Sequence, residues 1–242
     1  VVRAMDAVAA FTGSAGAQVN VKLKQAQRFI VTGHSKRAIA AYMAGAVDPR
    51  VKAIIPVGIS LNLYETGVES AHNLGGVPPE QIPYVRQGAM DLTEEQYKKL
   101  RAIIDPINYV DRLQMPKLAI FSGADDFLPP DVTRSWWGSV PEPKMMYVYG
   151  NSGHRGFDRL ANVHTKFLDV AEAFVSGFVL GSEMPKIEWA IGADSGDIAA
   201  RQVSNHTPTS VTLVATKTKT TDRRDFRKAH WTSRGHPTDV GH

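Results

Sequence analysis

The sequence contains no cysteine, which excludes disulfides and thiolate metal sites. Long apolar runs are also missing, since even residues 51–61 include a Lys, a Pro, a Gly and a Ser. This stretch is shorter than the roughly 20 apolar residues that cross a bilayer, so we expect no membrane span. The histidines show no metal-binding spacing such as His-Glu-x-x-His, and we expect neither a metal nor another cofactor.

The chain has little excess charge, with a formal charge of +4, and the excess lies in residues 217–228. A basic cluster can bind nucleic acid or an anionic surface, but it can also keep a solvated strand edge from aggregating. No stacking platform of aromatic side chains interleaves these charges, so we expect no nucleic-acid partner. The cluster consists of Lys217, Lys219, Arg223, Arg224, Arg227 and Lys228.

The composition is that of an ordinary globular chain, with 43% hydrophobic and 21% charged residues. A chain of this length can bury the core of one large domain, or of one large and one small domain. Its first residues lack the basic start, apolar centre and cleavage site of a signal peptide, and it does not begin with Met. We expect that it begins inside a longer protein.

Strand and helix patterns alternate over residues 1–181, which predicts an α/β domain with a mostly parallel sheet. The central unit is strand, helix, strand, and a crossover helix of this kind makes the two strands parallel neighbours. We expect strands at 28–32, 51–57, 117–121 and 145–149, and helices at 2–11, 36–46 and 157–180.

After residue 181 the pattern changes to short β-rich runs separated by turn residues, at 186–191, 197–203 and 210–215. This predicts a second, small, all-β and sandwich-like domain over 182–242. The alternative is an irregular extension that packs on the first domain.

Ser35 follows the end of a buried strand and precedes a helix of small residues, which is the context of a nucleophile elbow. There the serine Oγ projects above the sheet, and the N–H of Lys36 can bind a developing oxyanion. Gly33 supplies the small residue that the close approach of strand and helix needs, whereas Arg37 stands where the usual pattern has its second glycine. Serine is also a favoured helix N-cap, so the motif alone leaves both interpretations open.

Two later residues favour the interpretation of Ser35 as a nucleophile. Asp125 follows the strand at 117–121, where this fold presents its acid, and the adjacent Asp126 is an alternative acid. His154 follows the strand at 145–149, where the fold presents its base. Taken singly, the aspartate could be a turn residue and the histidine a surface residue. Together the order Ser, Asp, His predicts a triad in which the imidazole takes the serine proton and the carboxylate orients the imidazole.

Six motifs of the chain, at residues 29–38, 46–56, 104–118, 123–131, 143–154 and 224–227, carry a family resemblance. They resemble the PhoPQ-activated pathogenicity-related protein family. The resemblance implies an α/β-hydrolase domain followed by a β-sandwich tail, with Ser35, Asp125 and His154 as nucleophile, acid and base, in proteins that are typically secreted or periplasmic. Related proteins include secreted eukaryotic proteins described as proliferation repressors. The family usually has Ala and Gly where this chain has His34 and Ala38.

A full α/β-hydrolase has about four further strands before the elbow, and the half that carries them also carries the second oxyanion donor. We therefore expect residues 1–181 to be the C-terminal half of such a domain, with the missing N-terminal half of the same protein as its partner. The predicted function is a serine hydrolase that cleaves an ester or amide bond in a small molecule or peptide. The alternative is an exported binding or signalling protein on a hydrolase scaffold.

Residues 59–113 contain no strand pattern, but a Gly/Pro-rich stretch and a helix with Thr93 as its N-cap. This stretch is far longer than the two to six residues of a usual αβ connection. We therefore expect it to form a helical cap over the active site. Packing against a partner subunit is the alternative. The residues expected to line an acyl or peptide pocket are Leu61, Leu63, Tyr64, Leu74, Ile82, Tyr84, Val85 and Met90.

Overall fold

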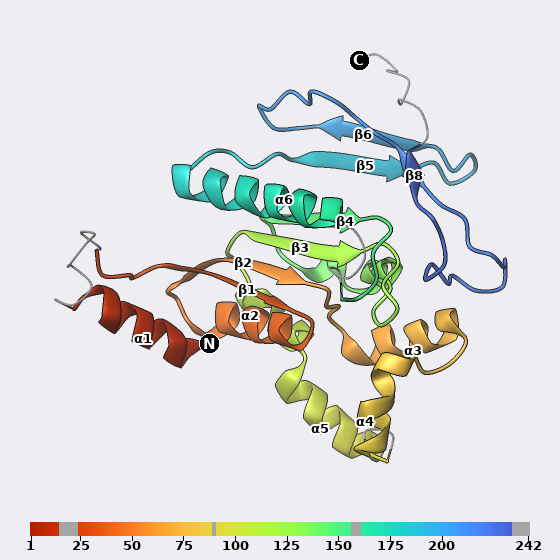
Figure 1. The fold of residues 1–242 in the computed structure, drawn as a ribbon, viewed down its shortest axis with the longest axis horizontal. Helices are drawn as coiled ribbons and strands as arrows, with labels where there is room; N and C mark the ends of the chain where they lie inside the picture. Colours follow the sequence, from red (N-terminus) through yellow and green to blue (C-terminus); the bar gives the residue numbers. More distant parts are fainter. Residues whose placement is uncertain (15–23, 89–90, 156–160, 234–242) are drawn as a thin grey trace.

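A computed structural model describes residues 1–14, 24–88, 91–155 and 161–233 of the chain. Four parallel strands form its central sheet, in the order β1-β2-β3-β4 (Figure 1). Strands β2 and β3 are buried along almost their whole length, as expected of parallel strands covered on both faces. The predicted α/β class with a parallel sheet is confirmed. The strands are β1 (Phe29–His34), β2 (Val51–Val57), β3 (Lys117–Ser122) and β4 (Lys144–Tyr149).

Helices cover both faces of this sheet (Figure 1). On one face lie α1 (Val2–Thr12) and α2 (Lys36–Val47), and on the other lies α6 (Ala161–Leu180). Helix α2 can approach the strands closely because its buried face consists largely of small residues, including Ala38 and Ala41. On the face covered by α6, Phe174 belongs to the core cluster between this helix and the sheet. The start predicted for this last helix, at 157–160, falls outside the described residues.

Strand β1 runs two residues further than predicted, to His34. The reason is its pairing with β2, which continues through Gly33 opposite Pro56 and His34 opposite Val57. The strand therefore leads directly into Ser35, whose position is fixed by both neighbouring elements.

A long helical segment connects β2 to β3 and projects beyond the carboxyl ends of the strands (Figure 1). Thr93 caps α5 as predicted, through a reciprocal capping box with Gln96. Of the expected pocket residues, Met90 falls outside the described residues. The segment contains α3 (Leu63–Leu74), η2 (Pro79–Gln81), α4 (Ile82–Arg86), α5 (Glu94–Ile104) and η3 (Pro106–Arg112).

The buried carboxylate of Asp105 joins the two ends of this segment. It accepts hydrogen bonds from the backbone N–H of Asn62 (3.2 Å) and of Leu63 (2.6 Å), where α3 begins. It also accepts one from the N–H of Ile107 (3.1 Å), where η3 begins. One side chain thus satisfies amides at two helix N-termini that have no intrahelical acceptor.

Replacing Asp105 with Ala should lower the free energy of unfolding by about 2–3 kcal/mol, because buried amides would lose their acceptor. Urea denaturation measures the change. The exposed Asp111 on η3 provides a matched control, since Asp111→Ala should change stability by less than about 0.5 kcal/mol. Equal losses in the two variants would contradict the role of Asp105.

Lys117 is a fully buried cation at the start of β3. Its ammonium donates to the carbonyl oxygens of Pro141 (2.8 Å) and Pro143 (3.1 Å), and burial lowers its pKa to about 8. Between about pH 8 and pH 10.5 the unfolded chain holds a proton that the folded protein has released, so stability should rise with pH in this window. Urea denaturation of the wild type and of Lys117→Met should show this rise, up to about 3 kcal/mol, only in the wild type. Parallel pH profiles of the two proteins would contradict it.

The C-terminal segment is the chain from residue 182 onward, described up to residue 233. It contains two short antiparallel pairs: β5 (Ile187–Ile191) with β6 (Ile198–Gln202), and β7 (Val214–Ala215) with β8 (Thr232–Ser233). Its all-β character agrees with the sequence, but the strand predicted at 210–215 is reduced to its last two residues. Apolar side chains such as Trp189 remain exposed on the first pair. The division into domains at 181/182 stays a prediction.

A pair of loops after β3 and β4 carries the remaining candidate residues. After β3 the chain passes Asp125 and enters two short helices, η4 (Pro130–Ser135) and η5 (Trp137–Ser139). After β4 it passes His154. Because carboxyl ends of parallel strands meet at one edge of the sheet, these loops and Ser35 lie together.

Candidate active site

Ser35 stands in a strained turn between β1 and α2, with φ 56° and ψ −127°. Its N–H donates to the Val57 carbonyl (2.8 Å), and its carbonyl accepts from the N–H of Ala38 (2.8 Å). Ser35 is the N-cap residue of α2 by position, but its side chain makes no capping hydrogen bond to the helix. Gly33 leaves room for the turn, because a Cβ there would lie 2.3 Å from the Arg37 carbonyl oxygen.

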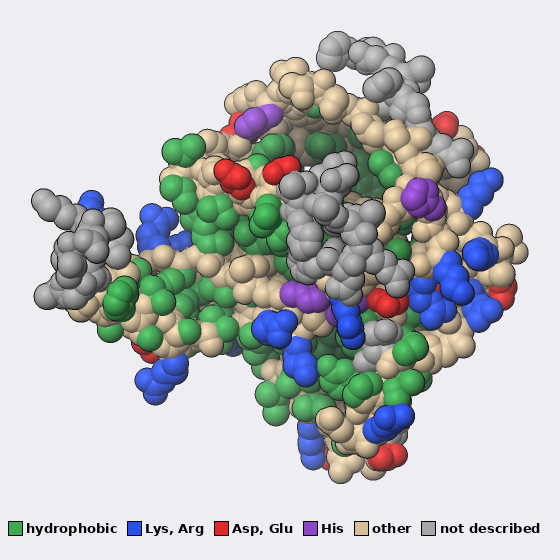
Figure 2. Space-filling model, in the orientation of Figure 1, with side chains coloured by type: hydrophobic (Ala, Val, Ile, Leu, Met, Phe, Trp, Pro, Cys, Tyr) green, Lys and Arg blue, Asp and Glu red, His purple; other side chains and the backbone are tan. Residues whose placement is uncertain are grey.

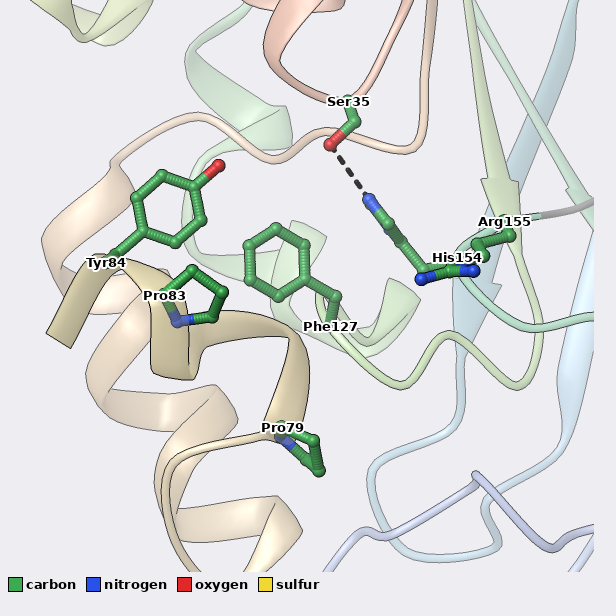
Figure 3. A pocket seen from close by; sticks show the side chains of 7 residues that line it. All are labelled: Ser35, Pro79, Pro83, Tyr84, Phe127, His154 and Arg155. Atoms are coloured by element: carbon green, nitrogen blue, oxygen red, sulfur yellow. Dashed lines mark hydrogen bonds between the residues drawn. The ribbon is translucent and has the colours of Figure 1, made fainter. Parts of the chain in front are cut away.

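The three predicted residues form one chain of hydrogen bonds. Ser35 Oγ lies 2.8 Å from His154 Nε2 (Figure 3). On the other side of the ring, His154 Nδ1 lies 3.0 Å from Oδ2 and 3.2 Å from Oδ1 of Asp125. Both the imidazole and the carboxylate are buried. Such a chain lets Nε2 accept the serine proton while the carboxylate holds the Nδ1 proton.

The two neighbouring aspartates have different partners. Asp125 Oδ1 accepts from the N–H of Phe127 (2.8 Å) and of Leu128 (2.7 Å), which fixes the carboxylate beside the imidazole. Asp126 Oδ1 accepts from the backbone N–H of His154 (3.0 Å). The geometry therefore gives Asp125 the contact with the ring, and Asp126 the contact with the loop that carries it.

Lys36 is the first residue of α2. Amides of the first helical turn lack intrahelical acceptors, so its N–H belongs to the kind of group that can bind an oxyanion. Its ammonium lies 5.3 Å from the centre of the Tyr84 ring, which links α2 to the helical segment.

His34 contacts His154, a role that the sequence did not indicate. Its Nε2 lies 2.8 Å from the His154 carbonyl oxygen, and the two rings are 5.0 Å apart. Burial lowers the pKa of His34, which favours the neutral ring, and Nε2–H then donates to that carbonyl. Gly58, at φ +59°, makes room for this ring, because a Cβ would lie 3.0 Å from His34 Nε2.

A cavity of about 360 Å³ opens beside Ser35 and His154 (Figure 3). Tyr84 stacks on Phe127, with ring centres 6.3 Å apart, and Phe127 meets the His154 ring edge-on at 4.8 Å. The helical segment thus lies at the mouth of the site, as expected, and contributes Pro79, Pro83 and Tyr84 to the cavity wall.

The expected set of pocket residues was mostly wrong. Of its described members, only Tyr84 lines the cavity. Leu61 and Leu74 are buried in the core, and Tyr64 and Ile82 are exposed to solvent. Instead, Pro79 of η2 and Pro83 of α4 line the cavity beside Ser35, which apolar spacing along the chain could not show.

The C-terminal segment holds the loops that carry Asp125 and His154 through Trp231. Its indole N–H donates to the Gly123 carbonyl (2.9 Å), and its backbone exchanges two hydrogen bonds with the Asn151 side chain (2.7 and 3.0 Å). Gly123 and Gly150 leave room for Trp231. A Cβ at Gly123 would lie 2.9 Å from the indole nitrogen, and a Cβ at Gly150 would lie 3.0 Å from the Trp231 Cβ.

Replacing Trp231 with Ala should lower the free energy of unfolding by about 2 kcal/mol, below the range for a fully buried Trp because this side chain is partly exposed. The loops of Asp125 and His154 lose a shared anchor. Thermal or urea denaturation measures the loss. The control is Trp189→Ala, at a side chain that is 68% exposed on β5 and should change stability little. A Trp231 variant as stable as this control would refute the anchor.

Neither a membrane span nor a metal centre is seen among the described residues. No helix within the described ranges is both long and apolar enough to span a bilayer. Likewise, no group of three or more His, Cys, Asp and Glu side chains in that part of the chain is arranged to hold a metal ion.

Comparisons with known proteins find relatives of this chain. The family model described as PhoPQ-activated pathogenicity-related protein matches residues 1–227. Autocrine proliferation repressor protein A of Dictyostelium discoideum is 30% identical over 237 residues, which are 94% of this chain and 46% of that protein.

Solved structures of α/β-hydrolases share the fold. An acetyl xylan esterase from Paenibacillus sp. R4 aligns with a TM-score of 0.51 at 23% identity, over 71% of this chain and 50% of that one. A puromycin hydrolase aligns with a TM-score of 0.50 at 19% identity, over 70% and 24%. The chain spans about half the length of the Dictyostelium relative and of the esterase.

Proposed function

The chain belongs to the PhoPQ-activated pathogenicity-related protein family, and we propose that it acts as a serine hydrolase on an ester or amide bond. The observation that carries the proposal is the hydrogen-bonded chain from Ser35 through His154 to Asp125. Its strained turn, buried carboxylate and adjoining cavity are the features that acyl transfer by a serine requires.

In the proposed reaction, Ser35 Oγ attacks the carbonyl carbon of the substrate as its proton moves to His154 Nε2. The oxygen of that carbonyl gains negative charge and accepts a hydrogen bond from the Lys36 N–H. His154 then gives the proton to the leaving alcohol or amine, and the acyl group stays on Ser35. Water, deprotonated by His154, attacks this acyl-enzyme, and the proton returns to Ser35 as the acid leaves.

Asp125 and two positioning residues support the imidazole in this scheme. The Asp125 carboxylate stabilises the imidazolium that forms in each step. His34 and Asp126 fix the backbone of His154, one at its carbonyl and one at its N–H. His154 is thereby held at its ring, its carbonyl and its N–H before the substrate binds, so little reorganisation is needed during the reaction.

A panel of ester, lactone and aminoacyl substrates tests the hydrolase directly, with the full-length wild type and the Ser35→Ala variant. We expect hydrolysis of at least one member, with kcat lowered by about six orders of magnitude in the variant. Hydrolysis that survives in a pure Ser35→Ala protein would refute the role of Ser35.

A second candidate function is an exported binding or signalling protein on the same scaffold. It is favoured by the name of the Dictyostelium relative, which describes a proliferation repressor. Both candidates agree with a secreted or periplasmic protein. If signalling is the function, wild type and Ser35→Ala should change the growth rate of responsive cells equally. Loss of the effect in a Ser35→Ala protein of unchanged thermal stability would refute this candidate.

A further inference from the structure

A second cavity, of about 370 Å³, meets the first at His154 and Arg155. One wall is formed by the loops of the acid and the base, and the other by residues 227–230 of the C-terminal segment. Trp231, anchored between the two loops, sets the position of this second wall. The site therefore has two lobes, and the proposed base lies where they join.

The second lobe is basic. Arg227 is committed to the protein, because it pairs with Asp225 and donates to the Leu74 carbonyl. Arg155 and Lys228 are exposed, and neither forms an ion pair with another described residue. Asp126 also lines the lobe, but its Oδ1 already accepts from the His154 N–H. Two cations are thus available to a bound group in this lobe.

Further cations lie on the segments next to the site. Lys36 and Arg37 are exposed at the start of α2, directly after Ser35. Arg223 and Arg224 are exposed on the C-terminal segment, but they pair with Asp222 and Asp131. Figure 2 shows Lys and Arg side chains gathered on both sides of the histidines at this face. Such a field attracts anions and strengthens their contacts within a cleft.

The first lobe differs in chemistry. Apart from Ser35, His154 and Arg155, its wall consists of two proline rings and two aromatic rings: Pro79, Pro83, Tyr84 and Phe127. A lobe of this kind holds an apolar or aromatic group by burial and stacking. The two halves of a substrate that spans the serine would therefore meet unlike surroundings.

We propose that the substrate is an ester or amide with an anionic group on one side of the scissile bond, held by Arg155 and Lys228, and an apolar group on the other. This inference rests on the proposed hydrolase function. The anion binds in the lobe that the C-terminal segment completes, and the apolar group binds beneath the prolines of the helical segment. Carboxylate and phosphate both satisfy the charge of the subsite.

Matched ester pairs test the preference. The pair 4-acetoxybenzoate and methyl 4-acetoxybenzoate places the charge on the alcohol side, and the pair 4-methylumbelliferyl monoadipate and hexanoate places it on the acyl side. In at least one pair we expect kcat/KM to be about tenfold higher for the anion at low salt, with the ratio falling as salt is added. In the Arg155→Gln/Lys228→Gln double variant the ratio should fall to within about twofold of unity.

The variant Lys98→Gln is the matched control, since it removes an exposed cation on α5 that already pairs with Glu94. It should keep the wild-type ratio. A wild type without preference in either pair, or a double variant that keeps the preference, would overturn the anionic subsite.

Binding separates this proposal from the hydrolase itself. Calorimetric titration of full-length Ser35→Ala with 4-acetamidobenzoate and with the neutral 4-acetamidobenzamide needs no turnover. If no ester is hydrolysed but the carboxylate binds more tightly, and loses that advantage without Arg155 and Lys228, the subsite stands and the hydrolase falls. If esters are hydrolysed without regard to charge, the hydrolase stands and the subsite falls.

Discussion

Replacing Asp125 with Asn should lower kcat by roughly four orders of magnitude while the fold is kept. The carboxylate now accepts the Nδ1 proton of His154 at 3.0 Å. An amide can instead donate to Nδ1, which favours the ring form with its proton on Nε2. That form cannot accept the proton of Ser35, so the attack on the substrate loses its base. Steady-state kinetics on the best ester of the panel measure the loss.

Asp126→Asn is the matched control for this variant. The asparagine keeps an oxygen that can accept from the His154 N–H, so kcat should stay within about tenfold of the wild type. The two aspartates are adjacent in sequence, and only their partners differ. Equal losses in both variants, or the larger loss at Asp126, would contradict the assignment of Asp125 as the acid.

Replacing Gly33 with Ala should destabilise the protein by about 3 kcal/mol or more. The new Cβ would lie 2.3 Å from the carbonyl oxygen of Arg37 and 2.5 Å from its carbonyl carbon. Both atoms belong to the backbone of α2, so the helix would have to move away from β1 and would take Ser35 with it. We expect a large loss of stability in urea denaturation, together with loss of activity.

Gly67→Ala on α3 is the control with the opposite expected sign. A Cβ there meets nothing within 4 Å, and the position is helical. Alanine should therefore stabilise the protein by roughly 0.5–1 kcal/mol. A Gly33→Ala protein as stable as this variant would show that the elbow does not need its close approach.

Local patterns in the sequence predicted the sheet and the order of the site residues. Strand β2 has the bounds that were expected, because a β-rich run is framed by Pro49 and Gly58. The positions of Ser35, Asp125 and His154 follow from strand ends, since parallel strands bring their carboxyl ends to one edge. Short, strongly apolar strands with clear turn residues on both sides made this part of the fold predictable.

The rest of the site depends on contacts between distant residues. The indole of Trp231 bonds to a carbonyl 108 residues away, and His34 bonds to one 120 residues away. No periodicity or spacing marks such pairs. The same holds for Pro79 in η2 and Pro83 in α4, which line the cavity beside Ser35 although they lie more than forty residues from it along the chain. The sequence singled out Ser35 as the candidate nucleophile, and the structure was needed for its surroundings.

The central claim is that Ser35 is an activated nucleophile, and a fluorophosphonate probe tests it most directly. The probe reacts with a serine only where a base and an oxyanion site assist the attack. We predict stoichiometric labelling of the full-length wild type, located at Ser35 by mass spectrometry, and none of Ser35→Ala. A folded wild type that stays unlabelled, or a Ser35→Ala protein that is labelled equally, would contradict the claim.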